Sequence, residues 1–202
     1  DVTTLSLAAT PSVAEGGMIV YTATLTSPAQ TPVTVTLDNG ATITIAAGAA
    51  SGTASVPAPG DDVYVDAGSV NASIVSATGG SFESLAIDPA PATTAITDTI
   101  DTTTVSLTAT PSVAEGGSIV YTASLTSPAQ TAVTVSLSNG ATITIAAGAA
   151  SGTVSVPAPA DDVYVDAGSV SATINSASGG NFENLVASRG AYGWCGRIHR
   201  CW

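Results

Sequence analysis

The stretch VYTATLTSPAQTPVTVTLDNGATITI, residues 20–45, decides the fold class of this chain. Apolar and polar residues alternate along VYTATLT, PVTVTL and ATITI, which is the period of strands that bury one face. No part of this stretch has the 3.6-residue period of a helix. The side chains expected on the core-facing side of its first strand are Ile19, Tyr21, Ala23 and Leu25.

Turn signals divide the alternating runs into separate strands. Asn39 and Gly40 between VTVTL and ATITI predict a hairpin with a type I′ turn, which needs a positive φ at both positions. Similar signals bound the other runs. The predicted strands are 3–9, 18–26, 32–37, 41–46, 52–57, 69–77 and 92–100. About seven short strands per hundred residues predict an all-β, immunoglobulin-like β-sandwich.

The pattern then starts again, with a period of 100 residues. Residues 101–186 restate residues 1–86 at about four positions in five, without a gap. A unit of this length can bury its own core, so we predict two tandem domains. The first spans 1–100 and the second 101–187, truncated before its last strand. Hardly any linker separates them, which predicts that the two sandwiches abut.

The tail, residues 188–202, does not follow the repeat. It holds all three Arg, the only His, both Cys and both Trp of the chain. We interpret it as an engineered or designed appendage, or an out-of-frame end, and exclude it from the fold prediction. Cys195 and Cys201 enclose GRIHR and could close a disulfide, with two free thiols as the alternative. Together with His199 they fall one ligand short of a zinc site.

Composition restricts the partners. The net charge is −12, and residues 1–188 contain no Lys, Arg, His or Cys. Such an acidic surface cannot release counterions from nucleic acid or from an anionic membrane, so neither is an expected partner. Cations are the expected partners. With 45% hydrophobic residues the chain should fold. We expect a soluble fragment, since it has neither an apolar run of 18 residues nor a signal peptide.

The acidic residues gather in three places that a seven-strand sandwich brings to one pole. These are the first loop, the fifth-to-sixth loop and the end of the last strand. In repeat one they hold Glu15, Asp61, Asp62, Asp66, Asp98 and Asp101. Repeat two keeps Glu115, Asp161, Asp162 and Asp166. Like charges at this density repel one another strongly, so we predict a cation among them.

Calcium fits such a site best, because it accepts six to eight oxygen ligands in flexible geometry. Zinc would call for His or Cys, and magnesium for a tighter octahedron. The alternative is that acids in loops are simply solvated. Asp38 is not expected to be a ligand, because repeat two has Ser138 there. Glu183, at the opposite pole of repeat two, could reach across to the site of repeat one.

The string TPSVAEGGSIVYTASLTSPAQTAVTVSLSNGATITIAAGAASGTVSVPAPADDVYVDAGSVSATI, residues 110–174, closely resembles the tandem repeats of giant LapA-type biofilm adhesins, which are RTX-adhesin-like. The resemblance covers residues 1–186. It implies immunoglobulin-like extender domains of a type I secreted protein held at the Gram-negative outer membrane, folding outside the cell in calcium. The EGG and DD placements are also loosely similar to Calx-β and cadherin-like modules, where calcium stiffens junctions.

The second copy departs from this pattern. Ile198 and Cys201 stand where the first copy has Asp98 and Asp101. We therefore predict weaker calcium binding at that pole, and lower stability for repeat two.

Three functions compete for this sequence. The leading one is a structural spacer of a cell-surface adhesin, stiffened by calcium at domain poles and junctions, whose partners are neighbouring repeats of the same chain. The second is a calcium-dependent module that binds a carbohydrate or a surface, for which Tyr64 and Tyr164 would supply the aromatic rings. An enzyme is the weakest, because the repeats offer only carboxylates and hydroxyls as catalysts and no expected cleft. We also expect no membrane insertion.

Overall fold

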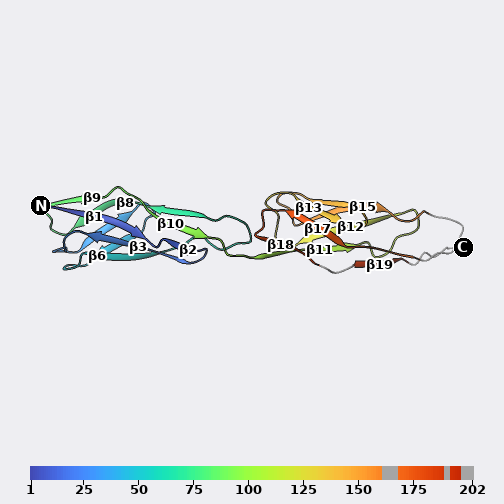
Figure 1. Cartoon of the computed structure of the whole chain (residues 1–202), viewed down its shortest axis with the longest axis horizontal. Helices are drawn as coiled ribbons and strands as arrows, with labels where there is room; N and C mark the ends of the chain where they lie inside the picture. The colour runs from blue at the N-terminus through green and yellow to red at the C-terminus, as the bar shows by residue number, and fades with distance from the viewer. Residues whose placement is uncertain (161–167, 189–191, 197–202) are drawn as a thin grey trace. The chain divides into compact units, whose positions relative to one another are not determined.

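A computed structural model describes residues 1–160, 168–188 and 192–196, the last of these by backbone alone. The described residues form strands and no helix, so none of them belongs to a helix that could cross a membrane. The chain divides into two compact units, each a β-sandwich (Figure 1). Unit 1 comprises Asp1–Asp61 and Asp66–Thr99, and unit 2 comprises Asp62–Val65 and Ile100–Trp202.

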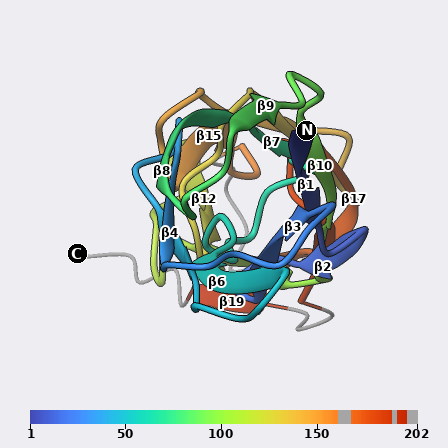
Figure 2. The ribbon, with the colours of Figure 1, turned by 90° about the vertical axis from the view of Figure 1, so that its left-hand side faces the viewer.

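Unit 1 is built from three sheets. The four-stranded sheet has the order β6 (Ser51–Pro57), β3 (Met18–Leu25), β1 (Val2–Ala9) and β9 (Ser84–Ile87). A three-stranded sheet has the order β5 (Thr42–Ile45), β4 (Val33–Leu37) and β8 (Ile74–Gly79), and β4 and β8 lie side by side in Figure 2. The third has the order β2 (Ser12–Ala14), β10 (Ala92–Thr97) and β7 (Gly68–Ala72).

Unit 2 repeats most of this order. Its four-stranded sheet runs β15 (Ser151–Pro157), β12 (Ser118–Leu125), β11 (Thr102–Ala109) and β18 (Asn184–Ala187). Its three-stranded sheet runs β14 (Thr142–Ile145), β13 (Val133–Leu137) and β17 (Ile174–Gly179). The remaining pair is β16 (Gly168–Ala172) with β19 (Tyr192–Gly196).

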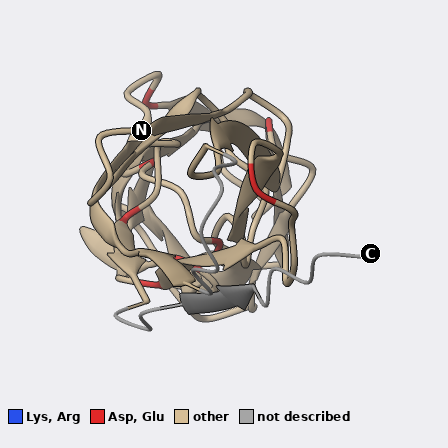
Figure 3. Cartoon of the chain, turned by 90° about the vertical axis from the view of Figure 1, so that its right-hand side faces the viewer, with Lys and Arg blue, Asp and Glu red and all other residues tan. Residues whose placement is uncertain are grey.

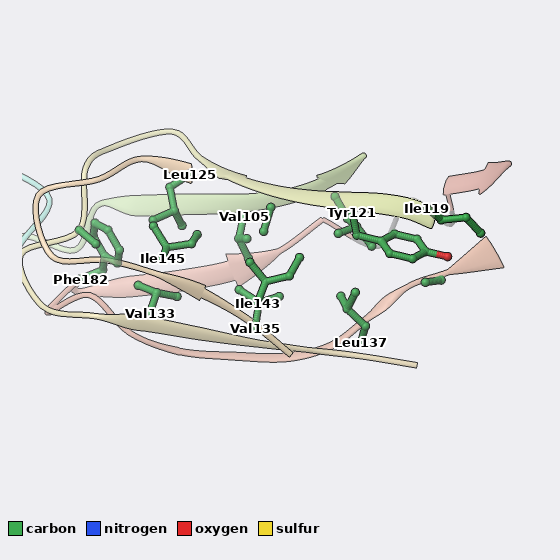
Figure 4. Close-up of a cluster of buried hydrophobic side chains, with 14 of the residues drawn as sticks. Val105, Ile119, Tyr121, Leu125, Val133, Val135, Leu137, Ile143, Ile145 and Phe182 are labelled. Atoms are coloured by element: carbon green, nitrogen blue, oxygen red, sulfur yellow. The ribbon is translucent and has the colours of Figure 1, made fainter. Parts of the chain in front are cut away.

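The core of each unit comes from the alternation in its strands. The predicted inner face of β3 is confirmed, since Ile19, Tyr21, Ala23 and Leu25 are all at most 3% exposed. Figure 4 shows the matching core of unit 2, where side chains from β11 to β14 interdigitate. Phe182, in the turn before β18, closes one end of this cluster. Burying these aliphatic side chains is the main favourable term in folding.

The hairpin at Gly40 is present, but the prediction of a type I′ turn was wrong. Among the described residues other than glycine, only Ser81 and Asn181 have a positive φ, so Asn39 does not. Gly40 alone takes a left-handed φ, of 82°, and its N–H donates to Leu37 O at 3.0 Å. This is the three-residue alternative, in which a type I turn is followed by one left-handed glycine.

The predicted strand 69–77 is two strands in different sheets. Its first part is β7, which pairs with β10. The strand is interrupted at Ser73, and the second part is β8, which pairs with β4. Alternation continues through the break, so periodicity could not reveal it. Two short strands, β2 and β9, were also not predicted. Each pairs in parallel with a neighbour distant in sequence, β2 with β10 and β9 with β1.

The end of unit 2 differs from the predicted truncation. Part of the tail forms β19, which pairs with β16 from Tyr192 opposite Ala172 to Gly196 opposite Gly168. This is the register of β10 on β7, where Ala92 lies opposite Ala72. An unpaired strand edge favours any extended segment that satisfies its backbone groups, so a non-repeat sequence can occupy it. The predicted disulfide involves Cys201, which lies outside the described residues.

Candidate metal centre

The loop that carries Glu15 is fixed by its own backbone. Glu15 N–H donates to Thr97 O at 3.1 Å, and Gly16 N–H donates to Pro59 O at 2.7 Å. Gly16 has a φ of 67°, a left-handed conformation that glycine adopts without strain. The EGG motif therefore holds Glu15 between the end of β10 and the loop after β6.

Four carboxylates of unit 1 gather around this loop, and we call them the carboxylate cluster. Glu15 is only 7% exposed, and one of its oxygens lies within 4.8 Å of an oxygen of Asp98. The Asp66 carboxyl lies close enough to that of Glu15 to share a proton with it. Asp61 lies beside the loop and accepts a hydrogen bond from the Thr99 hydroxyl. The members of the cluster are Glu15, Asp61, Asp66 and Asp98.

The mutual repulsion of its carboxylates makes the cluster favour the binding of a proton or a cation. The hydrogen bond with Asp66, then burial, then repulsion from Asp66 and Asp98 raise the pKa of Glu15 to about 7. Within the described part of the chain, Glu15 Oε2 and Asp98 Oδ1 are buried and have no hydrogen-bond partner. Buried polar atoms without partners are rare in proteins, and a cation bound between the two carboxylates would supply the missing partner.

The donor set fits calcium. Every candidate ligand is an oxygen, supplied by the carboxylates of the cluster and by the Thr99 hydroxyl beside Asp61. Oxygen-only sites with several carboxylates suit calcium, whereas zinc sites use histidine or cysteine, which residues 1–188 lack. The cluster could therefore bind a hard divalent cation.

The remaining predicted ligands do not all join this cluster. Asp62 and Asp101 belong to unit 2, where Asp62 Oδ1 accepts from Tyr64 N–H at 2.8 Å and Asp101 N–H donates to the Glu183 carboxylate. Both stay predicted ligands, and so does Glu115, which is half-buried in unit 2. Figure 3 marks the acidic positions in red. Asp161, Asp162 and Asp166 lie outside the described residues.

Sequence reasoning missed the hydroxyl and carbonyl that complete the surroundings of the cluster. Thr99 bonds Asp61, and Thr97 O accepts from Glu15 N–H. Their signal was present in TDTID, where threonines flank Asp98 at the end of the last strand. The reach of Glu183 to the acids of repeat one stays a prediction.

A second feature concerns the tyrosine of DDVYVD. Asp62–Val65, here called the tyrosine segment, belongs to unit 2. The Tyr64 ring stacks on Phe182 with centroids 5.5 Å apart and planes inclined by 23°. Its hydroxyl donates to Pro128 O at 2.5 Å. Both ends of this side chain therefore have partners.

The backbone of the tyrosine segment adds a short strand to the turn before β18. Val65 N–H donates to Asn181 O, and Glu183 N–H donates to Val63 O, both at 3.1 Å. Tyr64 and Phe182 form an antiparallel bridge between these two bonds. Phe182 is consequently only 8% exposed. The sequence periodicity did not predict the contact of Tyr64 with Phe182, because these residues lie more than a hundred positions apart.

We expect the stability of unit 1 without divalent cations to fall as the pH rises. The pKa of Glu15 lies above its ordinary value of 4.5, so its protonated form stabilises the fold. That contribution is complete below about pH 4.5 and is lost as the pH rises to about 7. Hydrogen exchange of β2 and β3 in chelator, measured across this range, should quicken with pH after correction for intrinsic rates. Glu15→Gln should flatten this dependence, and an unchanged slope would contradict the assignment.

The comparisons with known proteins point to one family. The family model described as the LapA domain matches residues 1–99 and again residues 101–192. A search of curated proteins found no match. A solved structure described as "tetra-tandem repeat in extending region of large adhesion protein" is similar at 15% identity and a TM-score of 0.34. The match covers 95% of this chain and 47% of that one, so this chain spans about half its length.

Proposed function

This chain belongs to the LapA domain family, and we propose from that premise that its repeats are spacers in the stalk of a secreted adhesin. The stalk is held at a Gram-negative outer membrane after type I secretion, and it places an adhesive region of the parent away from the cell. Calcium in the carboxylate cluster makes the spacer rigid. The observation that carries the calcium proposal is the pair of buried Glu15 and half-buried Asp98, each with a buried oxygen that lacks a hydrogen-bond partner among the described residues.

Chain connectivity supports a stiffening role for the cation. β10 ends at Thr97 and β11 begins at Thr102, so only residues 98–101 connect the repeats. Asp98 belongs to the cluster, and Thr99 is bonded to Asp61. A cation that binds these side chains restricts the first half of a very short connection. Fewer accessible conformations of the connection mean a stiffer array.

The spacer role is preferred to carbohydrate binding for a specific reason. Sugar-binding aromatic residues expose a ring face beside the metal, but the Tyr64 ring is stacked on Phe182 and its hydroxyl is bonded. Tyr164, the other candidate ring, lies outside the described residues. The repeats also consist largely of Thr, Ser and Ala outside their cores, which suits a solubilising surface. Calcium-dependent signals on a glycan array would favour the carbohydrate-binding function instead.

The stiffening is tested by small-angle X-ray scattering of the intact chain in calcium and in chelator. We expect the calcium profile to indicate a rigid, extended pair, and the chelated profile a flexible one. Asp98→Asn should give the flexible profile in both conditions. Asp38→Asn removes the same charge from the hairpin turn and should behave as the unaltered chain. Superimposable profiles of the unaltered chain in the two conditions would contradict the proposal.

A further inference from the structure

The turn that receives the tyrosine segment in unit 2 has a counterpart in unit 1. The receiving turn is 179–183, and its counterpart is 79–83. Gly180 has a φ of 87° and Gly80 one of 86°, while Asn181 and Ser81 have 60° and 56°. The two turns therefore have the same backbone conformation.

The surroundings of the two turns match as well. Gln130 N–H donates to Gly180 O, and Gln30 N–H donates to Gly80 O, both at 3.1 Å. A Cβ on Gly80 would lie 2.1 Å from the ring of Phe82, so this ring lies directly over the glycine. The same holds in unit 2, at 2.3 Å. The ring of Phe82 is thus held by its own turn, in the position that Phe182 has under Tyr64.

The two turns differ in whether a segment is bound to them: the tyrosine segment covers turn 179–183, and its counterpart 79–83 has no such strand paired with it in the described part of the chain. Phe182 is 8% exposed under the Tyr64 ring, whereas Phe82 is only half-buried. In the described part of the chain, Ser81 O and Glu83 N–H take part in no backbone hydrogen bond, although their counterparts bond the tyrosine segment. A surface that already has the bound conformation loses little entropy when it binds.

We propose that the turn 79–83 of repeat one binds the tyrosine segment of another copy of the repeat. The occupant has the sequence Asp-Val-Tyr-Val, which this chain carries at 62–65 and at 162–165. It adds as a short antiparallel strand to Ser81 and Glu83, its tyrosine ring stacks on Phe82, and its hydroxyl donates to Pro28 O. Repeats of this kind then join head to tail, each one donating a tyrosine and accepting one.

The two turns differ at one position, Ser81 against Asn181, and this difference predicts how strongly each binds the tyrosine segment. The Asn181 amide donates to Gln130 Oε1 at 2.7 Å and reaches Val65 O at 3.5 Å. Ser81 cannot make both contacts, and its hydroxyl instead lies 3.2 Å from that of Thr31. Turn 79–83 should therefore bind the segment more weakly than turn 179–183. One net hydrogen bond corresponds to roughly a fivefold change in affinity.

The test uses the intact chain, labelled with ¹⁵N, and an unlabelled capped peptide with the sequence of residues 61–67. Backbone amide shifts are followed up to millimolar peptide, in chelator as well as in calcium. We expect saturable shifts at Ser81, Phe82 and Glu83, and their loss with a peptide that carries Tyr64→Ala. The chain variant Ser81→Asn should bind the peptide about fivefold more tightly.

Two results would overturn the inference: no shifts at turn 79–83 at the highest peptide concentration, or equal shifts with the alanine peptide. The inference rests on the proposed spacer role only in taking the natural occupant to be a neighbouring repeat. Peptide binding in chelator supports docking whatever calcium does. Calcium-dependent stiffening without peptide binding would leave the proposed function intact and remove the inference alone.

Discussion

Calcium is expected to slow amide hydrogen exchange in unit 1 of the intact chain roughly 100-fold when its concentration is about 100 times the dissociation constant. The reason is linkage, because a cation that binds only the folded unit stabilises it by about 2.7 kcal/mol under these conditions. Unit 2 should respond less, since Ile198 stands where repeat one has Asp98, a member of the carboxylate cluster. Exchange measured by mass spectrometry reports the two units separately.

The effect of Glu15→Gln on the rate of hydrogen exchange should have opposite signs in chelator and in calcium. In chelator near neutral pH the variant should exchange more slowly than the unaltered chain, because it removes a carboxylate whose pKa is raised to about 7. In calcium it should exchange faster, because a ligand is lost. Asp38→Asn is the matched control, since it removes one charge from the hairpin turn of the same unit. An equal calcium response of the two variants would rule out Glu15 as a ligand.

Tyr64→Ala is expected to destabilise unit 2 by about 2 kcal/mol, roughly half the cost of truncating a fully buried aromatic side chain. The variant loses the stacking on Phe182 and the hydrogen bond to Pro128 O. Exchange should quicken first at residues 181–183, whose backbone pairs with the tyrosine segment. Denaturant unfolding, followed together with exchange, measures both effects.

Graded and control variants separate the contributions to this effect. Tyr64→Phe keeps the ring and removes only the hydroxyl, so it should cost about 1 kcal/mol. Val75→Ala truncates a side chain that is 63% exposed in β8 and should change little. If Tyr64→Ala costs no more than Val75→Ala, the contact with Phe182 contributes nothing to stability.

The strands of this protein were predictable wherever one face is buried. The alternation around Tyr21 predicted β3 and its core residues, because burial on one side leaves a period of two in the sequence. Periodicity does not record which sheet a strand joins, so the break at Ser73 was missed. The short parallel strand β9 was missed for the same reason, since its partner lies far away in sequence.

The candidate site was predictable in part. Knowledge of which loops share a pole was enough to expect Glu15, Asp66 and Asp98 together. It could not show that Asp62 and Asp66, four residues apart, belong to different units. The segment Asp62–Val65 pairs and stacks with residues around Phe182, and a contact so distant in sequence leaves no local pattern.

The parallel pairing of β1 with β9 affects how unit 1 responds to a pulling force on its two ends. Val2 to Leu5 run beside Ser84 to Ile87 in the same direction. A pull on the chain ahead of β1 and on the chain after β10 acts along these strands, and it tries to slide one past the other. The hydrogen bonds of the ladder then share the load and must break together instead of one by one. We expect such a unit to resist sudden force, as the proposed spacer role would require.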